Sequence, residues 1–106
     1  MMEFENVSEQ GKYANGTSLQ GYVFDKTRAD LEAAFGSPVE YEEGDKVTLE
    51  WILIFDDGVT ATIYDWKRYE LGTPGMYESV DWNIGGKTYL ASERVSEALA
   101  KARQVA

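Results

Sequence analysis

Residues 51–66 (WILIFDDGVTATIYDW) have the pattern of a single β-hairpin. Two stretches rich in β-branched and aromatic residues flank Asp56-Asp57-Gly58, and such residues favour strands whereas Asp and Gly favour tight turns. Strands joined by so short a turn run antiparallel. The chain therefore folds around an antiparallel sheet, and the turn decides which side chains share a face.

The length of the hairpin loop follows from the side chains that each choice would pair. A two-residue turn would place two acids, Glu50 and Asp65, directly opposite each other, which destabilises a sheet. A three-residue loop, with Gly58 in the left-handed bulge position, pairs Phe55 with Val59 instead. One face is then wholly apolar and consists of Trp51, Leu53, Phe55, Val59, Ala61 and Ile63. Because a slip of one residue would move a whole strand's side chains to the other face, we predict the three-residue loop.

The second face of the hairpin mixes polar and apolar side chains. It carries Thr48, Glu50, Ile52, Ile54, Thr60, Thr62, Tyr64 and Trp66. Two arrangements fit this pattern. In one, the N-terminal arm or loops cover part of the face; in the other, an aromatic and aliphatic patch stays exposed for a partner or for a homodimer through this face.

Two helices are predicted outside the hairpin. Thr27 is a favourable N-cap for a first helix, which Gly36 ends. Thr88 is a favourable cap for a last helix that extends to about Arg103. The apolar positions of the last helix recur at helical spacing and predict an inward face made of Ala91, Val95, Ala98, Leu99 and Ala102.

The order of the predicted elements gives the fold class. Residues 19–24 and 80–84 alternate as strands do, and with the hairpin they make four strands. We predict an α+β two-layer sandwich, in which a mainly antiparallel four-stranded sheet carries both helices on one face. We expect residues 1–15 to form a flexible arm and residues 16–104 to form a single domain.

The chain contains neither cysteine nor histidine among its 106 residues. Thiol catalysis, Ser/His/Asp triads and cysteine or histidine zinc sites are therefore excluded. No side chain ordinarily titrates near neutral pH, so acid–base catalysis would need a strongly shifted carboxylate, Lys or Tyr. We expect no enzymatic activity, no metal and no cofactor.

The formal net charge is −9, and the acids are unevenly distributed. Residues 39–57 contain one lysine and seven acids, which are Glu40, Glu42, Glu43, Asp45, Glu50, Asp56 and Asp57. Such a surface repels nucleic acid and anionic membranes and complements a basic protein, although a net charge also serves solubility alone. No apolar run is long enough to span a bilayer, and residues 1–10 lack the basic start of a signal peptide, so we expect a cytoplasmic location.

Asp65 is the acid with the most unusual predicted position. The chosen register places it on the core side at a strand end, where a buried carboxylate needs hydrogen-bond donors. It either caps amides of the glycine-rich segments or pairs with Lys67 or Arg68, or it contacts a ligand. In the last case a small-ligand or nucleotide site would comprise Thr17, Ser18, Gln20, Asp65, Lys67, Asn83 and Gly85, which lie at element ends.

Six segments together resemble a family of small proteins encoded by tailed bacteriophages. They are Gly16-Thr17-Ser18-Leu19-Gln20-Gly21-Tyr22, Gly36-Ser37-Pro38, Glu50-Trp51, Phe55-Asp56-Asp57-Gly58, Ala61-Thr62-Ile63-Tyr64-Asp65-Trp66-Lys67 and Trp82-Asn83-Ile84-Gly85-Gly86. The resemblance implies an accessory protein that acts in the cytoplasm of the infected bacterium. By analogy with small acidic phage proteins, it implies binding to and blocking of a host or defence protein, as anti-CRISPR inhibitors do.

Charge and resemblance lead to the same functional expectation. We expect a binding protein that occludes a basic site, such as a nucleic-acid-binding site, on a bacterial host or defence protein, without contacting nucleic acid itself. The predicted contact residues are Glu40, Glu42, Glu43, Asp45, Glu50, Ile52, Ile54, Tyr64 and Trp66. The small-ligand module is the alternative.

Overall fold

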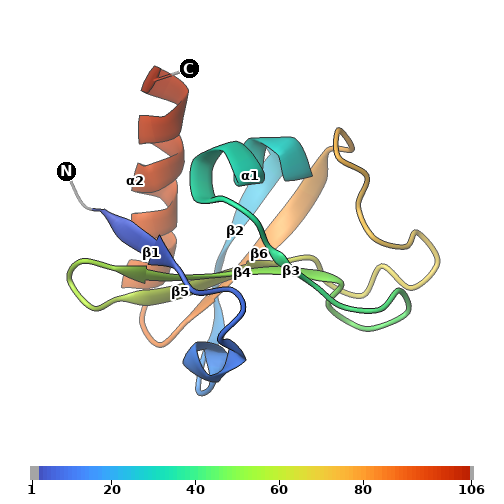
Figure 1. Ribbon diagram of the computed structural model, residues 1–106, viewed down its shortest axis with the longest axis horizontal. Coiled ribbons are helices and arrows are strands. Elements are labelled where there is room, and N and C mark those ends of the chain that lie inside the picture. The colour runs from blue at the N-terminus through green and yellow to red at the C-terminus, as the bar shows by residue number, and fades with distance from the viewer. Residues whose placement is uncertain (1–2, 106) are drawn as a thin grey trace.

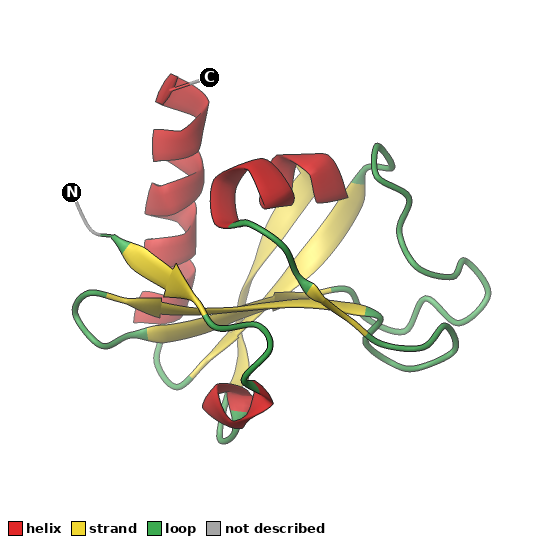
Figure 2. Ribbon diagram, in the orientation of Figure 1, coloured by secondary structure: helices red, strands yellow, loops and turns green. Residues whose placement is uncertain are grey.

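Two α-helices lie on one side of an antiparallel β-sheet (Figures 1 and 2). The computed structural model describes residues 3–105. The elements are β1 Phe4–Asn6, the 3-10 helix η1 Gly11–Ala14, β2 Ser18–Lys26, α1 Arg28–Phe35, β3 Val39–Glu40, β4 Leu49–Phe55, β5 Thr60–Tyr64, β6 Val80–Gly86 and α2 Leu90–Val105. The predicted α+β class is confirmed.

The sheet has more strands than the four that the sequence predicted. Its order is β1-β4-β5-β6-β2, and β3 also pairs with β4. Strands β1 and β3 pair with different parts of the same edge of β4, since Phe4 pairs with Phe55 whereas Val39 pairs with Glu50. Strands of two or three residues are too short to show a period of two, so no pattern in these segments predicted them. Part of the expected N-terminal arm is thus a strand of the sheet.

The register of the central hairpin is confirmed. Trp51 pairs with Ile63 and Leu53 pairs with Ala61, which is the register of the three-residue loop. The amide of Phe55 donates to the carbonyl of Val59 at 2.9 Å, and the amide of Gly58 donates to the carbonyl of Phe55 at 2.8 Å. Gly58 has a φ of +86°, a conformation that glycine adopts without steric cost.

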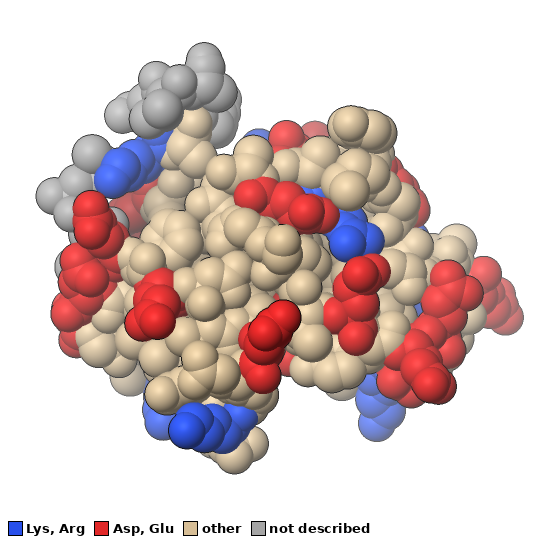
Figure 3. All heavy atoms as spheres, viewed as in Figure 1, with Lys and Arg blue, Asp and Glu red and all other residues tan. Residues whose placement is uncertain are grey.

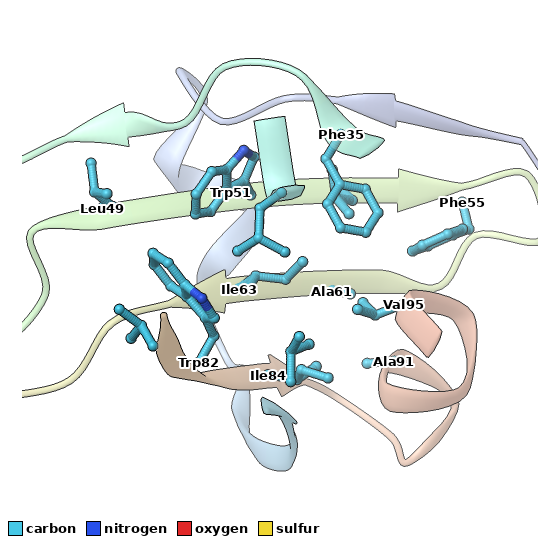
Figure 4. Close-up of a cluster of buried hydrophobic side chains, with 14 residues drawn as sticks. Phe35, Leu49, Trp51, Phe55, Ala61, Ile63, Trp82, Ile84, Ala91 and Val95 are labelled. Carbon is cyan, nitrogen blue, oxygen red and sulfur yellow. The ribbon is translucent and has the colours of Figure 1, made fainter. Parts of the chain in front are cut away.

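The apolar face of the hairpin forms the core together with both helices (Figure 4). Leu31 and Phe35 of α1 and Ala91 and Val95 of α2 are buried in the same cluster as the predicted hairpin face. The first helix begins as predicted, because the Thr27 hydroxyl accepts from the amide of Asp30 in a capping box. The apolar face of the sheet is therefore turned toward the two helices, and the opposite face is available for other contacts.

Two buried tryptophans fix the position of α1 against the sheet. The rings of Trp51 and Trp82 meet edge to face with centroids 5.4 Å apart. The indole nitrogen of Trp51 donates to the carbonyl of Gly36 at 2.8 Å, and that of Trp82 donates to the carbonyl of Lys26 at 2.9 Å. Both accepting carbonyls flank α1, so the two indoles tie the ends of that helix to the sheet.

Candidate binding surface

The sheet face opposite the helices, which we call the outer face, is covered over only part of its area. Helix η1 lies beneath the sheet against β4 and β5, on the side away from α1 and α2 (Figure 1). The segment after β1 binds the backbone of Ile52, whose carbonyl accepts from the Val7 amide at 2.8 Å and whose amide donates to the Ser8 hydroxyl at 3.0 Å. Ile52 is fully buried in consequence. The prediction that Ile52 contacts a partner is therefore wrong, because the N-terminal segment covers it.

Beyond this covered area, one row of side chains crosses four strands of the outer face. Glu50 of β4 pairs with Tyr64 of β5, Tyr64 pairs with Asn83 of β6, and Asn83 pairs with Tyr22 of β2. Phe24, Tyr41 and Trp66 adjoin this row. We call the resulting surface the outer patch and define it as Tyr22, Phe24, Tyr41, Glu50, Tyr64, Trp66 and Asn83.

Aromatic side chains dominate the outer patch and are open to solvent. The rings of Tyr22 and Phe24 stack with centroids 5.5 Å apart, and those of Tyr64 and Trp66 meet edge to face at 6.1 Å. The exposed fractions are 49% for Tyr22, 64% for Phe24 and 46% for Trp66. Exposed aromatic clusters of this kind are uncommon on surfaces that contact only water and mark interaction sites.

A half-buried carboxylate lies within these rings. The Tyr41 hydroxyl donates to Oε1 of Glu50 at 2.9 Å. Burial raises the pKa of Glu50 above its ordinary value, although the hydrogen bond from Tyr41 opposes the shift. Burial, with the hydrogen bond to Glu50, raises the pKa of Tyr41 to about 12. The patch thus combines aromatic side chains with one half-buried carboxylate.

The predicted acidic residues fall into two groups. Glu42, Glu43 and Asp45 are exposed in the loop between β3 and β4, which we call the acidic loop. Figure 3 shows acidic side chains gathered at the end of the molecule where this loop lies. Glu40 differs, because its carboxylate is 3.3 Å from the Arg28 guanidinium and forms an ion pair that links β3 to α1. The acidic loop and the outer patch adjoin, since Tyr41 leads from β3 into the loop.

Asp65 is a structural residue. It is fully buried, and its carboxylate accepts from the Thr48 amide at 2.8 Å, the Thr48 hydroxyl at 2.6 Å and the Leu49 amide at 2.8 Å. The predicted partners, glycine-rich amides or Lys67 or Arg68, are not the groups that satisfy it. Asp65 instead fastens the start of β4 to the end of β5, and three hydrogen bonds leave it no opening toward a ligand.

The other residues of the predicted ligand module do not converge on one pocket. Thr17 donates its hydroxyl to the carbonyl of Ala14 at 2.7 Å, and the Gln20 amide nitrogen donates to the Ser18 hydroxyl at 3.1 Å. Gly85 is needed for packing, because a Cβ there would lie 2.5 Å from the Thr62 hydroxyl. None of the seven predicted ligand residues borders the hollow lined by Asn6, Val7, Ser8, Glu9, Gln10, Ser37 and Pro38.

Lys67 and Asn83, the remaining two, lie at the outer patch instead. The Lys67 ammonium is 5.5 Å from the centroid of the Trp66 ring, and Asn83 is beside Tyr64 in the sheet. Of the predicted partner residues, Glu50, Tyr64 and Trp66 belong to the patch, and Ile54 is half-buried next to Glu5 on β1. Three residues of the outer patch, Tyr22, Phe24 and Tyr41, were not among those predicted from the sequence. The alternation of residues 19–24 places Tyr22 and Phe24 on one face, but only the pairing of β2 with β6 brings them to Tyr64.

No model of a known protein family matches the chain, and comparison with curated proteins finds no match. Within residues 3–105, neither helix has the length and apolarity required to cross a bilayer.

Proposed function

We propose that this chain is a non-enzymatic binding protein that docks on a basic surface of another protein through the outer patch and the acidic loop. With the resemblance described above, the proposal extends to a phage-encoded inhibitor. It would act in the cytoplasm of the infected bacterium and cover a basic site, such as a nucleic-acid-binding site, of a host or defence protein.

The observation that carries this proposal is the continuity of exposed aromatic rings with exposed acids. Trp66 and Tyr22 supply large rigid side chains of the kind that dominate protein interfaces. The acidic loop supplies a field that attracts and orients a basic partner before contact. The same acids repel phosphate, which disfavours direct binding of nucleic acid.

Affinity capture from bacterial lysate tests the proposal with a charge-reversal pair. The double variant Glu42→Lys/Glu43→Lys removes the acidic loop's field and spares the Glu40 ion pair with Arg28. The matched control Glu3→Lys/Glu93→Lys changes the net charge equally at two other exposed acids. We expect the wild-type chain and the control variant to retain a bacterial protein at low salt. The Glu42→Lys/Glu43→Lys variant should not retain that protein, and added salt should release it from the wild-type chain. Equal retention by both double variants would contradict the electrostatic docking.

The inhibitor part of the proposal has its own test. When a captured protein binds nucleic acid, added chain should displace that nucleic acid in a mobility-shift assay, because both occupy the same basic site. A ternary complex of chain, partner and nucleic acid would contradict occlusion of such a site.

A further inference from the structure

The Glu50 carboxylate lies beside a group of aromatic side chains on the outer patch. The Tyr41 hydroxyl touches Oε1 at 2.9 Å, Tyr64 is the cross-strand neighbour of Glu50, and Trp66 packs edge to face on Tyr64. Among residues 3–105, no hydrogen bond is made to Oε2, and Glu50 is not closed off from the surface. This carboxylate therefore keeps one acceptor oxygen for an outside donor.

The chemistry of this cluster selects a cation. The face of an aromatic ring is negative and attracts a positive group within about 6 Å of its centroid. Trp66 already attracts one in this way, since the Lys67 ammonium is 5.5 Å from its ring. The carboxylate adds a full negative charge where partial burial strengthens its pull on a cation.

Among biological cations, the guanidinium of arginine fits this set of groups best. It is planar, so it stacks on an indole or phenol ring while its edge donates hydrogen bonds to a carboxylate. An ammonium is a hydrated point charge that stacks poorly and forms no such fork. We propose that the outer patch is a receptor for an arginine side chain of a partner protein, with the guanidinium stacked on Trp66 or Tyr64 and hydrogen-bonded to Oε2 of Glu50. The choice of a protein partner rests on the proposed function.

Three capped glycine-rich peptides test the proposal, and they differ only at their central residue. One carries arginine, the second lysine, and the third citrulline, which has nearly the shape of arginine but no charge. We expect the arginine peptide to shift the amide resonances of Glu50, Tyr64 and Trp66 in ¹⁵N spectra. We expect the lysine peptide to bind several-fold more weakly and the citrulline peptide not to bind. Equal binding of arginine and citrulline peptides, or shifts confined to residues 42–45, would overturn the receptor.

Variants locate the site. Trp66→Ala and Glu50→Gln should each weaken the arginine peptide about tenfold, through loss of a ring face and of a charged acceptor. Tyr77→Ala and Glu93→Gln are the controls, because both residues are exposed and lie outside the patch. Unchanged affinity in both patch variants would overturn the proposal. So would a wild-type dimer in sedimentation that Trp66→Ala dissociates, because a second copy would then occupy the patch.

The peptide and capture experiments fail independently. If the arginine peptide binds but both double variants capture the same protein equally from lysate, the proposed docking is contradicted while the arginine receptor stands. If capture behaves as proposed and no peptide discriminates arginine from citrulline, the receptor alone fails.

Discussion

The hydroxyl of Tyr41 donates a 2.9 Å hydrogen bond to Oε1 of Glu50. Tyr41 directly follows β3, the two-residue strand whose pairing with the β4 edge fixes where the phenol lies. A two-residue strand at the edge of the sheet thus positions the donor to one oxygen of the Glu50 carboxylate, and no hydrogen bond from residues 3–105 reaches the other oxygen.

Replacing Glu50 with Gln should stabilise the fold near neutral pH. Burial raises the pKa of Glu50, so the folded state disfavours the charged carboxylate more than the unfolded chain does. The contribution of Glu50 to stability is therefore fully present below its ordinary value of 4.5 and is lost as the pH rises through the raised pKa. Urea unfolding at about pH 7 and about pH 4 should show a gain at the higher pH that shrinks at the lower. A loss of stability at the higher pH would mean that Glu50 is held as a favourable anion.

Tyr41 should remain protonated well into the alkaline range. Its pKa is raised to about 12 by burial and by the hydrogen bond to Glu50. Absorbance titration of the folded protein should therefore show a late phenol transition that Tyr41→Phe removes. Because the folded pKa exceeds that of the unfolded chain, the Tyr41 contribution to stability should be lost as the pH rises from about 10 toward 12. Tyr77→Phe, at a phenol that is 82% exposed, serves as the control.

Asp65→Ala should cost about 2–4 kcal/mol in the free energy of unfolding, because the buried amides of Thr48 and Leu49 would lose their acceptor. Thr48→Val removes one of the three hydrogen bonds and should cost about 1 kcal/mol. Asp45→Ala, at an exposed acid of the acidic loop, should change stability by less than about 0.5 kcal/mol. Chemical denaturation compares the three, and an Asp65→Ala variant as stable as Asp45→Ala would contradict the structural role.

Gly58→Ala should destabilise the hairpin by about 1–2 kcal/mol. Gly58 has a φ of +86°, and a residue with a Cβ atom is sterically strained in that backbone conformation. Gly11→Ala is the matched control, since a Cβ there would meet no atom within 4 Å and its φ is not in the left-handed region. Equal stabilities of the two variants would indicate that the loop is not the three-residue bulge.

The hairpin register was predictable because its alternatives differ in the placement of a whole apolar face. The same pattern predicted the core role of Trp51 and Ile63. The burial of Ile52 depends on where the N-terminal segment docks, and no periodicity in that segment indicates a docking position. Asp65 was placed in the interior correctly but assigned the wrong partners, since its donors are Thr48, just before β4, and Leu49, the first residue of β4.

The outer patch was only partly predictable. Glu50, Tyr64 and Trp66 follow from the hairpin register. Tyr22 and Phe24 reach them through β6, and the β2–β6 ladder contains two register shifts that local alternation does not reveal. Surfaces assembled across several strands depend on long-range pairing, which a single sequence specifies weakly.

Photo-crosslinking tests most directly whether the outer patch is the docking surface. A photo-reactive phenylalanine analogue is placed at Phe24, which is 64% exposed on the patch, or at Tyr77, which is 82% exposed elsewhere. In bacterial extract, the probe at position 24 should crosslink to a basic protein, and excess unlabelled chain should abolish that product. Competable crosslinks from position 77 and none from position 24 would contradict the assignment of the outer patch as the binding surface.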